Sequence, residues 1–305
     1  MAAVAASGWW AWRHARAPMV AGWSPPSGER RCAGSLAART LGGADDAVVL
    51  LHGLTASGDS FGGGYDRLSE ERKLVVPDLL GFGGSMDMHH ESFGLDAHLD
   101  ALDAMANELA LDAGRWVVGG HSMGGVLALH WAARHAERVE RVVTWGAPLH
   151  TDREAAVAAI TRMGWLESIF ILQTPLARAV CTWMCEHRTA AGWLAVALNP
   201  DTPIALARQG VLHTWPAYRD ALDELVLAQD WRPAVETLVR ANVPLVLTHG
   251  ADDPVVDAVL LGDLARRHSC VEVVSRRDEG HELPVAQPAS SAEQLRSTSW
   301  SASPP

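Results

Sequence analysis

Short runs of apolar residues recur along the chain, and glycine, proline or polar residues separate them. A continuous apolar run of about five residues is typical of a strand that is buried on both faces of a sheet. Such runs occupy residues 47–51, 74–76, 116–118, 142–144 and 243–247, and a partly alternating run follows at residues 271–274. Two further short strands are predicted between residues 30 and 40, ahead of a pair of glycines.

Apolar residues at helical spacing fill several of the segments between these runs. Residues 93–111 and 123–135 show this pattern clearly. Strands that alternate with helices form βαβ units, and the strands of such units run parallel. The sequence therefore predicts an α/β fold, with a mainly parallel, twisted sheet and helices on both of its faces.

Residues 148–229 interrupt this alternation, because they lack a strong strand signal and read as successive helices. Threonine–proline pairs at residues 174–175 and 202–203 are typical of a helix N-cap followed by the first helical position. We interpret residues 148–229 as an all-helical cap, inserted into an α/β core of residues 28–147 and 230–300. The tryptophans of the cap either line an apolar pocket or pack between helices; they are Trp165, Trp183, Trp193 and Trp215.

The two ends of the chain show weaker patterns. Residues 1–27 have no sustained period and finish in a Ser/Pro/Gly-rich stretch, which predicts an N-terminal extension without regular structure. Beyond about residue 286 the chain becomes rich in serine and proline, with one short helix predicted near residues 292–296. The start lacks the charged segment of a signal peptide, so we expect a cytoplasmic protein, with secretion as the alternative.

Composition excludes several classes of protein. With 48% hydrophobic and 20% charged residues, a chain of 305 residues can bury a large core. The net charge of −11 and the lack of a basic block argue against nucleic acid as a main partner. Four cysteines are too few for a disulfide framework, and no ligand spacing predicts a metal site. The longest apolar runs are too short to predict a membrane span.

The sequence Gly-His-Ser-Met-Gly at residues 120–124 directly follows a predicted buried strand and begins a predicted helix. A Gly-x-Ser-x-Gly turn in this position is so sharp that larger residues two places before or after the serine would collide with the adjoining strand and helix. Such a turn holds the serine hydroxyl above the edge of the sheet. Ser122 is therefore a candidate nucleophile, the alternative being a glycine-rich turn that serves only packing.

A serine nucleophile needs a base, and the base needs a group that orients it. In a parallel sheet these groups are expected at the carboxyl ends of later strands. His281 follows the last predicted strand and a glycine, which makes it the candidate base, whereas His249 at the end of the preceding strand favours a structural role. Asp252 and Asp253 both follow that preceding strand, and each is a candidate acid.

Two backbone N–H groups are expected to bind the oxyanion that forms when a serine attacks a carbonyl carbon. One belongs to Met123, the residue after the nucleophile. The other is expected in the loop after an earlier strand, where Leu54 follows the strand predicted at residues 47–51. Because the backbone would do this work, the identity of either side chain is not restricted.

These segments together resemble the α/β-hydrolase superfamily, in its cap-bearing esterase and lipase-like branch. The resemblance covers about residues 30–285 and depends on five motifs in the order of that family. They lie at residues 51–53, 78–85, 120–125, 250–254 and 280–281. The acid of the family is the third residue after the glycine of the fourth motif, which implies Asp253. Asp78 matches a structural loop position and is given no catalytic role.

Departures from related families narrow the chemistry that the resemblance implies. Haloalkane dehalogenases and epoxide hydrolases place an aspartate where this chain has Ser122. Lysine-dependent hydroxynitrile lyases need a lysine near the site, but Lys73 begins a strand and so lies at the opposite end. Hydrolases of ring-cleavage C–C bonds often carry asparagine before the serine and tryptophan after the histidine, whereas His121 precedes the serine here and residues 282–287 contain no tryptophan.

We therefore predict a serine hydrolase that cleaves a small carboxylic ester with an apolar acyl part through an acyl-enzyme. Ser122 is the predicted nucleophile, His281 the base and Asp253 the acid, and no cofactor or metal is expected. The same residues acting on a thioester, a lactone or a C–C bond are the alternative reactions. A ligand-binding protein with little turnover on the same scaffold is the alternative from another functional class.

Overall fold

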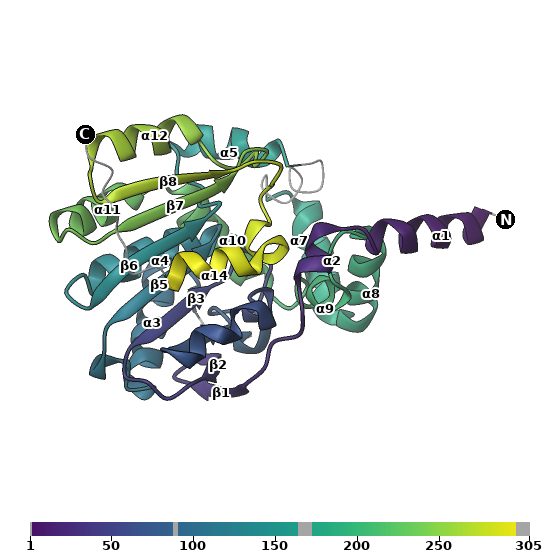
Figure 1. Ribbon diagram of the computed structural model, residues 1–305. Coiled ribbons are helices and arrows are strands. Elements are labelled where there is room, and N and C mark those ends of the chain that lie inside the picture. The colour runs from purple at the N-terminus through teal and green to yellow at the C-terminus, as the bar shows by residue number, and fades with distance from the viewer. Residues whose placement is uncertain (1, 88–90, 164–172, 297–305) are drawn as a thin grey trace.

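The computed structural model describes residues 2–87, 91–163 and 173–296 of the chain. Their strands form one sheet in the order β1-β2-β4-β3-β5-β6-β7-β8, in which β1–β2 and β2–β4 pair antiparallel and all other neighbours pair parallel (Figure 1). The strands are β1 (Glu29–Ala33), β2 (Leu36–Leu41), β3 (Ala47–Leu51), β4 (Lys73–Pro77), β5 (Trp116–His121), β6 (Val139–Trp145), β7 (Leu245–Gly250) and β8 (Val271–Arg276). The predicted α/β fold with a mainly parallel sheet is confirmed.

Continuous apolar strands arise because the sheet has a hydrophobic core on each face. Along β3, Val49 and Leu51 pack into the larger core, whereas Val48 and Leu50 point to the smaller one. Successive side chains of a strand point to opposite faces, so a strand between two cores must be apolar at every position.

Helices cover both faces of the sheet. The larger core is covered by α3 (Leu95–Glu108), α4 (Met123–Arg134), α11 (Trp231–Arg240) and α12 (Ala258–Arg267). The smaller core is covered by the 3₁₀ helix η2 (Gly63–Glu70), α13 (Leu283–Ala286) and α14 (Pro288–Arg296). Short 3₁₀ turns complete this part of the chain: η1 (Gly58–Ser60), η3 (Gly83–Ser85) and η4 (Leu111–Ala113).

A series of helices separates β6 from β7, and we call them the inserted helices. They are α5 (Arg153–Thr161), α7 (Pro175–Glu186), α8 (Arg188–Leu198), α9 (Ile204–Gln209), α10 (Trp215–Ala221) and the π-helix η5 (Leu222–Leu227), followed by α11. Thr174 caps α7 as predicted, since its hydroxyl accepts a hydrogen bond from the N–H of Ala177 at 3.1 Å. The predicted cap at Thr202 is wrong, because Pro203 itself occupies the extended position that precedes α9.

The tryptophans of this segment do not share one environment. Trp183 and Trp193 are exposed, Trp215 is partly buried against the larger core, and Trp165 lies outside the described residues. Core packing between helices therefore does not account for Trp183 and Trp193, whose exposed fractions are 40% and 53%. Neither side chain is needed to fill the interior, so their exposure requires another explanation.

The N-terminal segment corrects another prediction. It contains two helices, α1 (Ala2–His14) and α2 (Pro18–Gly22), where the sequence predicts no regular structure. Figure 1 shows α1 extending from the molecule beside α8 and α9. No amphipathic period marks α1, because its residues before Arg13 include no charged side chain. Among the described residues, no helix is both long and apolar enough to cross a membrane.

Candidate active site

Ser122 lies at the turn between β5 and α4 in a conformation that few non-glycine residues adopt. Its φ is +53° and its ψ is −121°, and α4 begins at the next residue. A Cβ on Gly120 would lie 2.1 Å from the carbonyl oxygen of Gly124, and a Cβ on Gly124 would lie 2.2 Å from that of Leu51. Only glycine fits at either position, as expected for this sharp turn.

The structure brings Ser122, His281 and Asp253 together. Nε2 of His281 lies 3.0 Å from the hydroxyl oxygen of Ser122, and Nδ1 lies 3.0 and 3.1 Å from the two carboxylate oxygens of Asp253. Asp253 follows β7 and His281 follows β8, so both side chains come from loops at the carboxyl edge of the parallel sheet. The arrangement places a base between a hydroxyl and an acid.

The competing candidates lie away from this cluster or make other bonds. Asp252 is exposed, whereas the side chain of Asp253 is buried. His249 donates through Nδ1 to the carbonyl of Gly250 at 2.8 Å. Asp152, a further carboxylate that follows β6, caps α5 and accepts a hydrogen bond from the N–H of Ala155. Only Asp253 is within hydrogen-bond distance of His281 among the carboxylates of the described residues.

The two predicted oxyanion donors border the serine on the expected sides. Met123 is the first residue of α4, and a Cβ on Gly53, the residue before Leu54, would lie 3.3 Å from Cβ of Ser122. Within the described part of the chain, neither the N–H of Leu54 nor that of Met123 donates a hydrogen bond. Both N–H groups are therefore free to bind an oxyanion, and the role of Leu54 and Met123 stays a prediction.

The charges in the cluster favour an ionised acid and a base that titrates above the usual range. Burial disfavours imidazolium, but the hydrogen bond to Asp253 and its negative charge outweigh burial, so the pKa of His281 is raised. Burial likewise opposes ionisation of Asp253, but the hydrogen bond and charge of His281 outweigh it and lower the pKa of the carboxyl group. Near neutral pH, Asp253 is thus an anion that orients the ring.

This pairing predicts an acid-side limit to activity. His281 accepts a proton only when neutral, so kcat/KM should fall as pH decreases through its raised pKa, with a midpoint above the ~6.5 of an ordinary histidine. The negative charge of Glu282 also raises that pKa, so Glu282→Gln should move the midpoint downward. Glu272→Gln, on exposed β8 surface, is the matched control and should leave it unchanged. A flat profile from about pH 5 to 9 would contradict His281 as the base.

His121 holds the loop that carries the base. In the sequence it is notable only as a departure from the pattern of the C–C bond hydrolases. Its Nε2 lies 2.9 Å from the backbone carbonyl oxygen of His281, and burial lowers the pKa of its ring, which keeps it neutral. A neutral ring with its proton on Nε2 donates to that carbonyl and fixes the loop that carries His281.

His121, His281 and Glu282 form a cluster whose possible metal-ligand atoms lie within 4.8 Å of one another. Both ring nitrogens of His281 are already hydrogen-bonded to Asp253 and Ser122, so we assign no metal there.

Gly146 was missed by sequence reasoning although it adjoins the cluster directly. It follows β6 with φ of +61°, and a Cβ there would lie 3.0 Å from both Nδ1 of His281 and Oδ2 of Asp253. Glycine leaves the space that the histidine–aspartate pair occupies. A glycine two residues after the central strand predicted at residues 142–144 was the available signal, but it does not reveal which side chains approach.

Replacing Gly146 should move His281 and Asp253 apart. Gly146→Ala combines a strained φ with a Cβ that displaces the imidazole or the carboxylate, and a misplacement near 1 Å costs roughly 10²-fold in rate. We expect kcat to fall about that much while KM changes little. Gly262→Ala, in the middle of α12 where a Cβ approaches only the end of Arg266, is the control and should retain activity. Equal kcat values for the two variants would contradict the role of Gly146.

A second layer of buried polar groups supports the loops around the serine. Nε2 of His52 accepts from the N–H of Leu79 at 2.8 Å, and Nδ1 donates to the carbonyl of Gly53 at 2.8 Å. The carboxylate of Asp78 accepts from two backbone N–H groups, those of Gly58 and Gly84, each at 2.7 Å, and pairs with a guanidinium, that of Arg30. Asp78 thus ties loops together, and its position away from His281 agrees with the structural role predicted for it.

The inserted helices reach the loop that follows β3. The hydroxyl of Ser57 donates to the side-chain carbonyl oxygen of Gln209, at the end of α9. A Cβ on Gly210 would lie 3.0 Å from the carbonyl oxygen of Thr55. The segment between β6 and β7 therefore contacts the same loop that contains Leu54.

Comparison with known proteins places the chain as a whole. Residues 46–285 match the alpha/beta hydrolase fold family. The chain is similar to the magnesium-chelatase 30 kDa subunit of Rhodobacter capsulatus, with 30% identity over 235 residues, 77% of this chain and 80% of that protein. It is also similar to the 2-hydroxy-6-oxo-2,4-heptadienoate hydrolase of Pseudomonas putida, with 33% identity over 108 residues, which are 34% of this chain but only 38% of that protein.

Solved structures agree at the level of the fold. A thermophilic esterase from Thermogutta terrifontis superposes with a TM-score of 0.60 at 22% identity, covering 86% of this chain and 91% of the esterase. At this level of identity the likeness extends to the fold alone.

Proposed function

Because the chain belongs to the α/β-hydrolase family, we propose that it is a serine hydrolase that cleaves a carboxylic ester. The observation that carries this proposal is the chain of close contacts from Ser122 through His281 to Asp253 at the carboxyl edge of the sheet. A protein that only bound a ligand would not require these three side chains in this order.

In the proposed reaction the hydroxyl of Ser122 attacks the ester carbonyl carbon while Nε2 of His281 takes its proton. Asp253 stabilises the imidazolium that forms. The N–H groups of Leu54 and Met123 bind the negatively charged oxygen of the tetrahedral intermediate. The intermediate collapses to an acyl-enzyme as His281 gives its proton to the departing alcohol. Water, deprotonated by His281, then attacks the acyl group and releases the acid and Ser122.

We further propose that the inserted helices form a cap beside this site and that the ester has an apolar acyl part. The contacts of Gln209 and Gly210 with the loop after β3 support the first proposal. The aliphatic and aromatic composition of the inserted helices supports the second. Apart from the substrate and water, the proposed reaction uses only groups of the chain, so no cofactor enters it, and the cytoplasm remains the proposed location.

The proposal is tested by screening p-nitrophenyl esters and thioesters of increasing acyl length, together with labelling by a fluorophosphonate. We expect ester turnover and a covalent label that peptide mapping places on Ser122. Turnover with the label on a different serine would contradict the assignment of the nucleophile, and neither label nor turnover would contradict the hydrolase proposal.

Two findings favour specific alternatives. One relative is named a hydrolase of 2-hydroxy-6-oxo-2,4-heptadienoate, which supports cleavage of a C–C bond in such a compound by the same residues. A relative similar over 77% of this chain is named a subunit of a magnesium chelatase, and we take a binding role within a larger assembly as the second alternative. Adding a 2-hydroxy-6-oxo-dienoate to the screen separates the first alternative from ester hydrolysis. Absence of turnover with every substrate would favour the second.

A further inference from the structure

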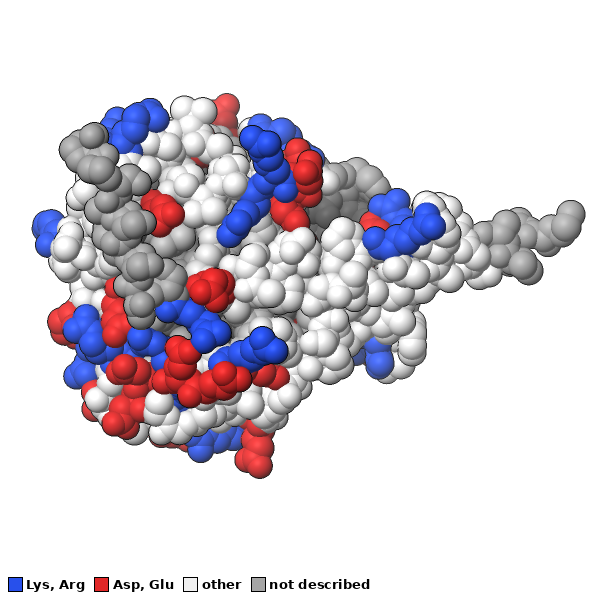
Figure 2. All heavy atoms as spheres, viewed as in Figure 1, with Lys and Arg blue, Asp and Glu red and all other residues white. Residues whose placement is uncertain are grey.

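Large hydrophobic side chains are exposed mainly on four helices, α1, α7, α8 and α9, whose exposed surface we call the apolar end. Of the large hydrophobic residues exposed in the described part of the chain, only Met163 and Val259 lie elsewhere. Those of the apolar end are Trp9, Trp12, Leu176, Val180, Trp183, Trp193, Leu194, Leu198 and Ile204. Figure 2 shows this end as largely uncharged, whereas charged side chains crowd the opposite part of the molecule. Scattered apolar residues are ordinary on a surface, but such a concentration indicates a binding face.

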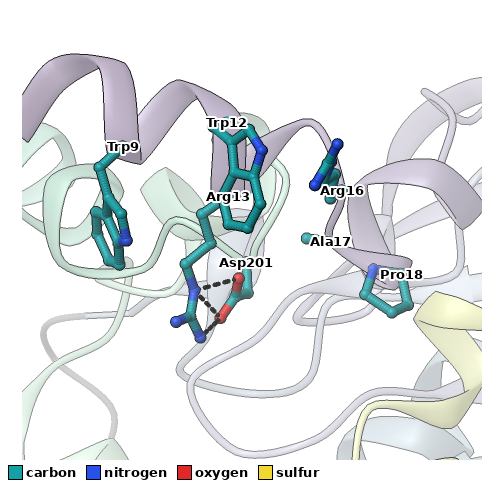
Figure 3. A pocket seen from close by; sticks show the side chains of 7 residues that line it. All are labelled: Trp9, Trp12, Arg13, Arg16, Ala17, Pro18 and Asp201. Atoms are coloured by element: carbon teal, nitrogen blue, oxygen red, sulfur yellow. Dashed lines mark hydrogen bonds and ion pairs between the residues drawn. The ribbon is translucent and has the colours of Figure 1, made fainter.

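The helix α1 is attached to the segment of the inserted helices by polar contacts. The indole N–H of Trp10 donates to the carbonyl of Val196 at 3.2 Å, and Nδ1 of His14 donates to the carbonyl of Pro200 at 2.8 Å. Trp9 and Trp12 line a pocket beside α1 together with Arg13 and Asp201 (Figure 3). Their exposed fractions are 54% and 56%. The attachment of α1 therefore leaves more than half of each indole accessible.

Arginine side chains accompany the exposed indoles. Arg16 lies over the ring of Trp12 at 4.5 Å from its centroid, and Arg208 lies over the ring of Trp193 at 5.0 Å. Arg13 lies over Trp9 and also pairs with Asp201, as Figure 3 shows. Tryptophan with a stacked arginine suits the boundary of a membrane, where the ring enters the headgroup layer and the guanidinium meets phosphate.

The charge of the apolar end is opposite to that of the rest of the protein. Residues 1–27 and 174–209 contain five arginines and two acidic residues, a net charge of +3. The whole chain carries −11, which leaves −14 for the remainder. No carboxylate of the described residues forms an ion pair with Arg16, Arg178 or Arg208. An apolar surface with unpaired cations is complementary to an anionic lipid surface.

We propose that the apolar end docks on the surface of an anionic lipid bilayer, with α1 lying within the headgroup layer. The 13 residues of α1 extend about 20 Å at 1.5 Å per residue, less than the ~30 Å hydrocarbon core of a bilayer. The helix thus lies in the interface and does not cross it. The acidic remainder of the chain is repelled by the same lipids, which orients the protein with the apolar end toward them.

A second copy of this chain fits the surface less well. A two-fold dimer places the same patch of both copies together. The five arginines of each copy would then meet only one carboxylate without an ion pair among the described residues, that of Glu186, because Asp201 is already paired with Arg13. Lipid phosphates, by contrast, supply the missing negative charge.

Co-sedimentation of the full chain with vesicles tests the proposal without depending on catalysis. We expect binding to phosphatidylcholine–phosphatidylglycerol vesicles that weakens with added salt. Trp9→Ser combined with Trp12→Ser should lower the partition coefficient at least about tenfold, because two large apolar side chains no longer enter the interface. Arg16→Gln should lower it about fivefold on these vesicles, but little on phosphatidylcholine alone.

Matched control variants change exposed residues of α12, which lies outside the apolar end. Val259→Ser removes an exposed apolar side chain at the start of α12, and Arg267→Gln removes an exposed charge at the end of the same helix; both should bind like the unaltered chain. Circular dichroism checks that each variant is folded. Failure of the unaltered chain to bind anionic vesicles would overturn the proposal, as would full binding by the folded double tryptophan variant. A dimer in sedimentation velocity that the double variant dissociates would identify a second copy as the occupant and also overturn it.

Discussion

Ser122→Ala should lower ester turnover by about 10⁶-fold, the size of effect seen when the nucleophile of a serine protease is removed. The reason is geometric as well as chemical. The hydroxyl of Ser122 lies 3.0 Å from Nε2 of His281, so its loss leaves the base with no nucleophile to activate. What remains is the slow attack of water on an ester held by the Leu54 and Met123 N–H groups. The measurement is kcat/KM on a single p-nitrophenyl ester, with fluorophosphonate labelling of the same sample.

The control for this change is a serine outside the cluster. Ser290 lies on α14, and its hydroxyl donates only to the carbonyl of Gln287 at 3.2 Å. Ser290→Ala should keep full turnover and labelling. Alanine at position 122 retains the strained φ of +53°, so the loss of activity should come without a matching loss of fold in circular dichroism. Substantial turnover by folded Ser122→Ala would move the nucleophile elsewhere.

The strands of this fold could be predicted because each central strand faces a core on both sides. Val48 to Leu51 must all be apolar for that reason, and the pattern is visible without any tertiary information. The helix α1 escaped prediction because amphipathic spacing arises only where one side of a helix is polar. In α1 the exposed positions include Trp9 and Trp12, so they are apolar as well. The sequence therefore lacks the alternation of apolar and polar positions that normally marks a surface helix.

Some residues of the candidate site could be predicted from local sequence, whereas others are recognised only from tertiary contacts. Ser122 and the flanking glycines form a turn that is local in sequence, which makes it predictable. His121 and Gly146 act on His281 across loops that come from three different strands. Their importance depends on the distance between segments far apart along the chain, and a single sequence contains no measure of that distance.

Asp252 and Asp253 are adjacent in sequence, but their replacement by asparagine should change activity by amounts that differ by orders of magnitude. Asp253→Asn should lower kcat by about 10⁴-fold, as the equivalent change does in a serine protease triad, because the amide can present its N–H₂ to the ring and hold the wrong tautomer. Asp252→Asn is the natural control and should cost little, since the side chain of Asp252 is exposed and the carboxylate hydrogen-bonded to His281 is that of Asp253. The pH dependence of kcat/KM gives an independent measurement. Asp253 is the main group that raises the pKa of His281, so the residual activity of Asp253→Asn should fall on the acid side with a lower midpoint pH. If Asp252→Asn is the inactive variant, the acid is assigned to the wrong residue. If both variants keep full activity, the histidine is oriented by something other than a carboxylate after β7.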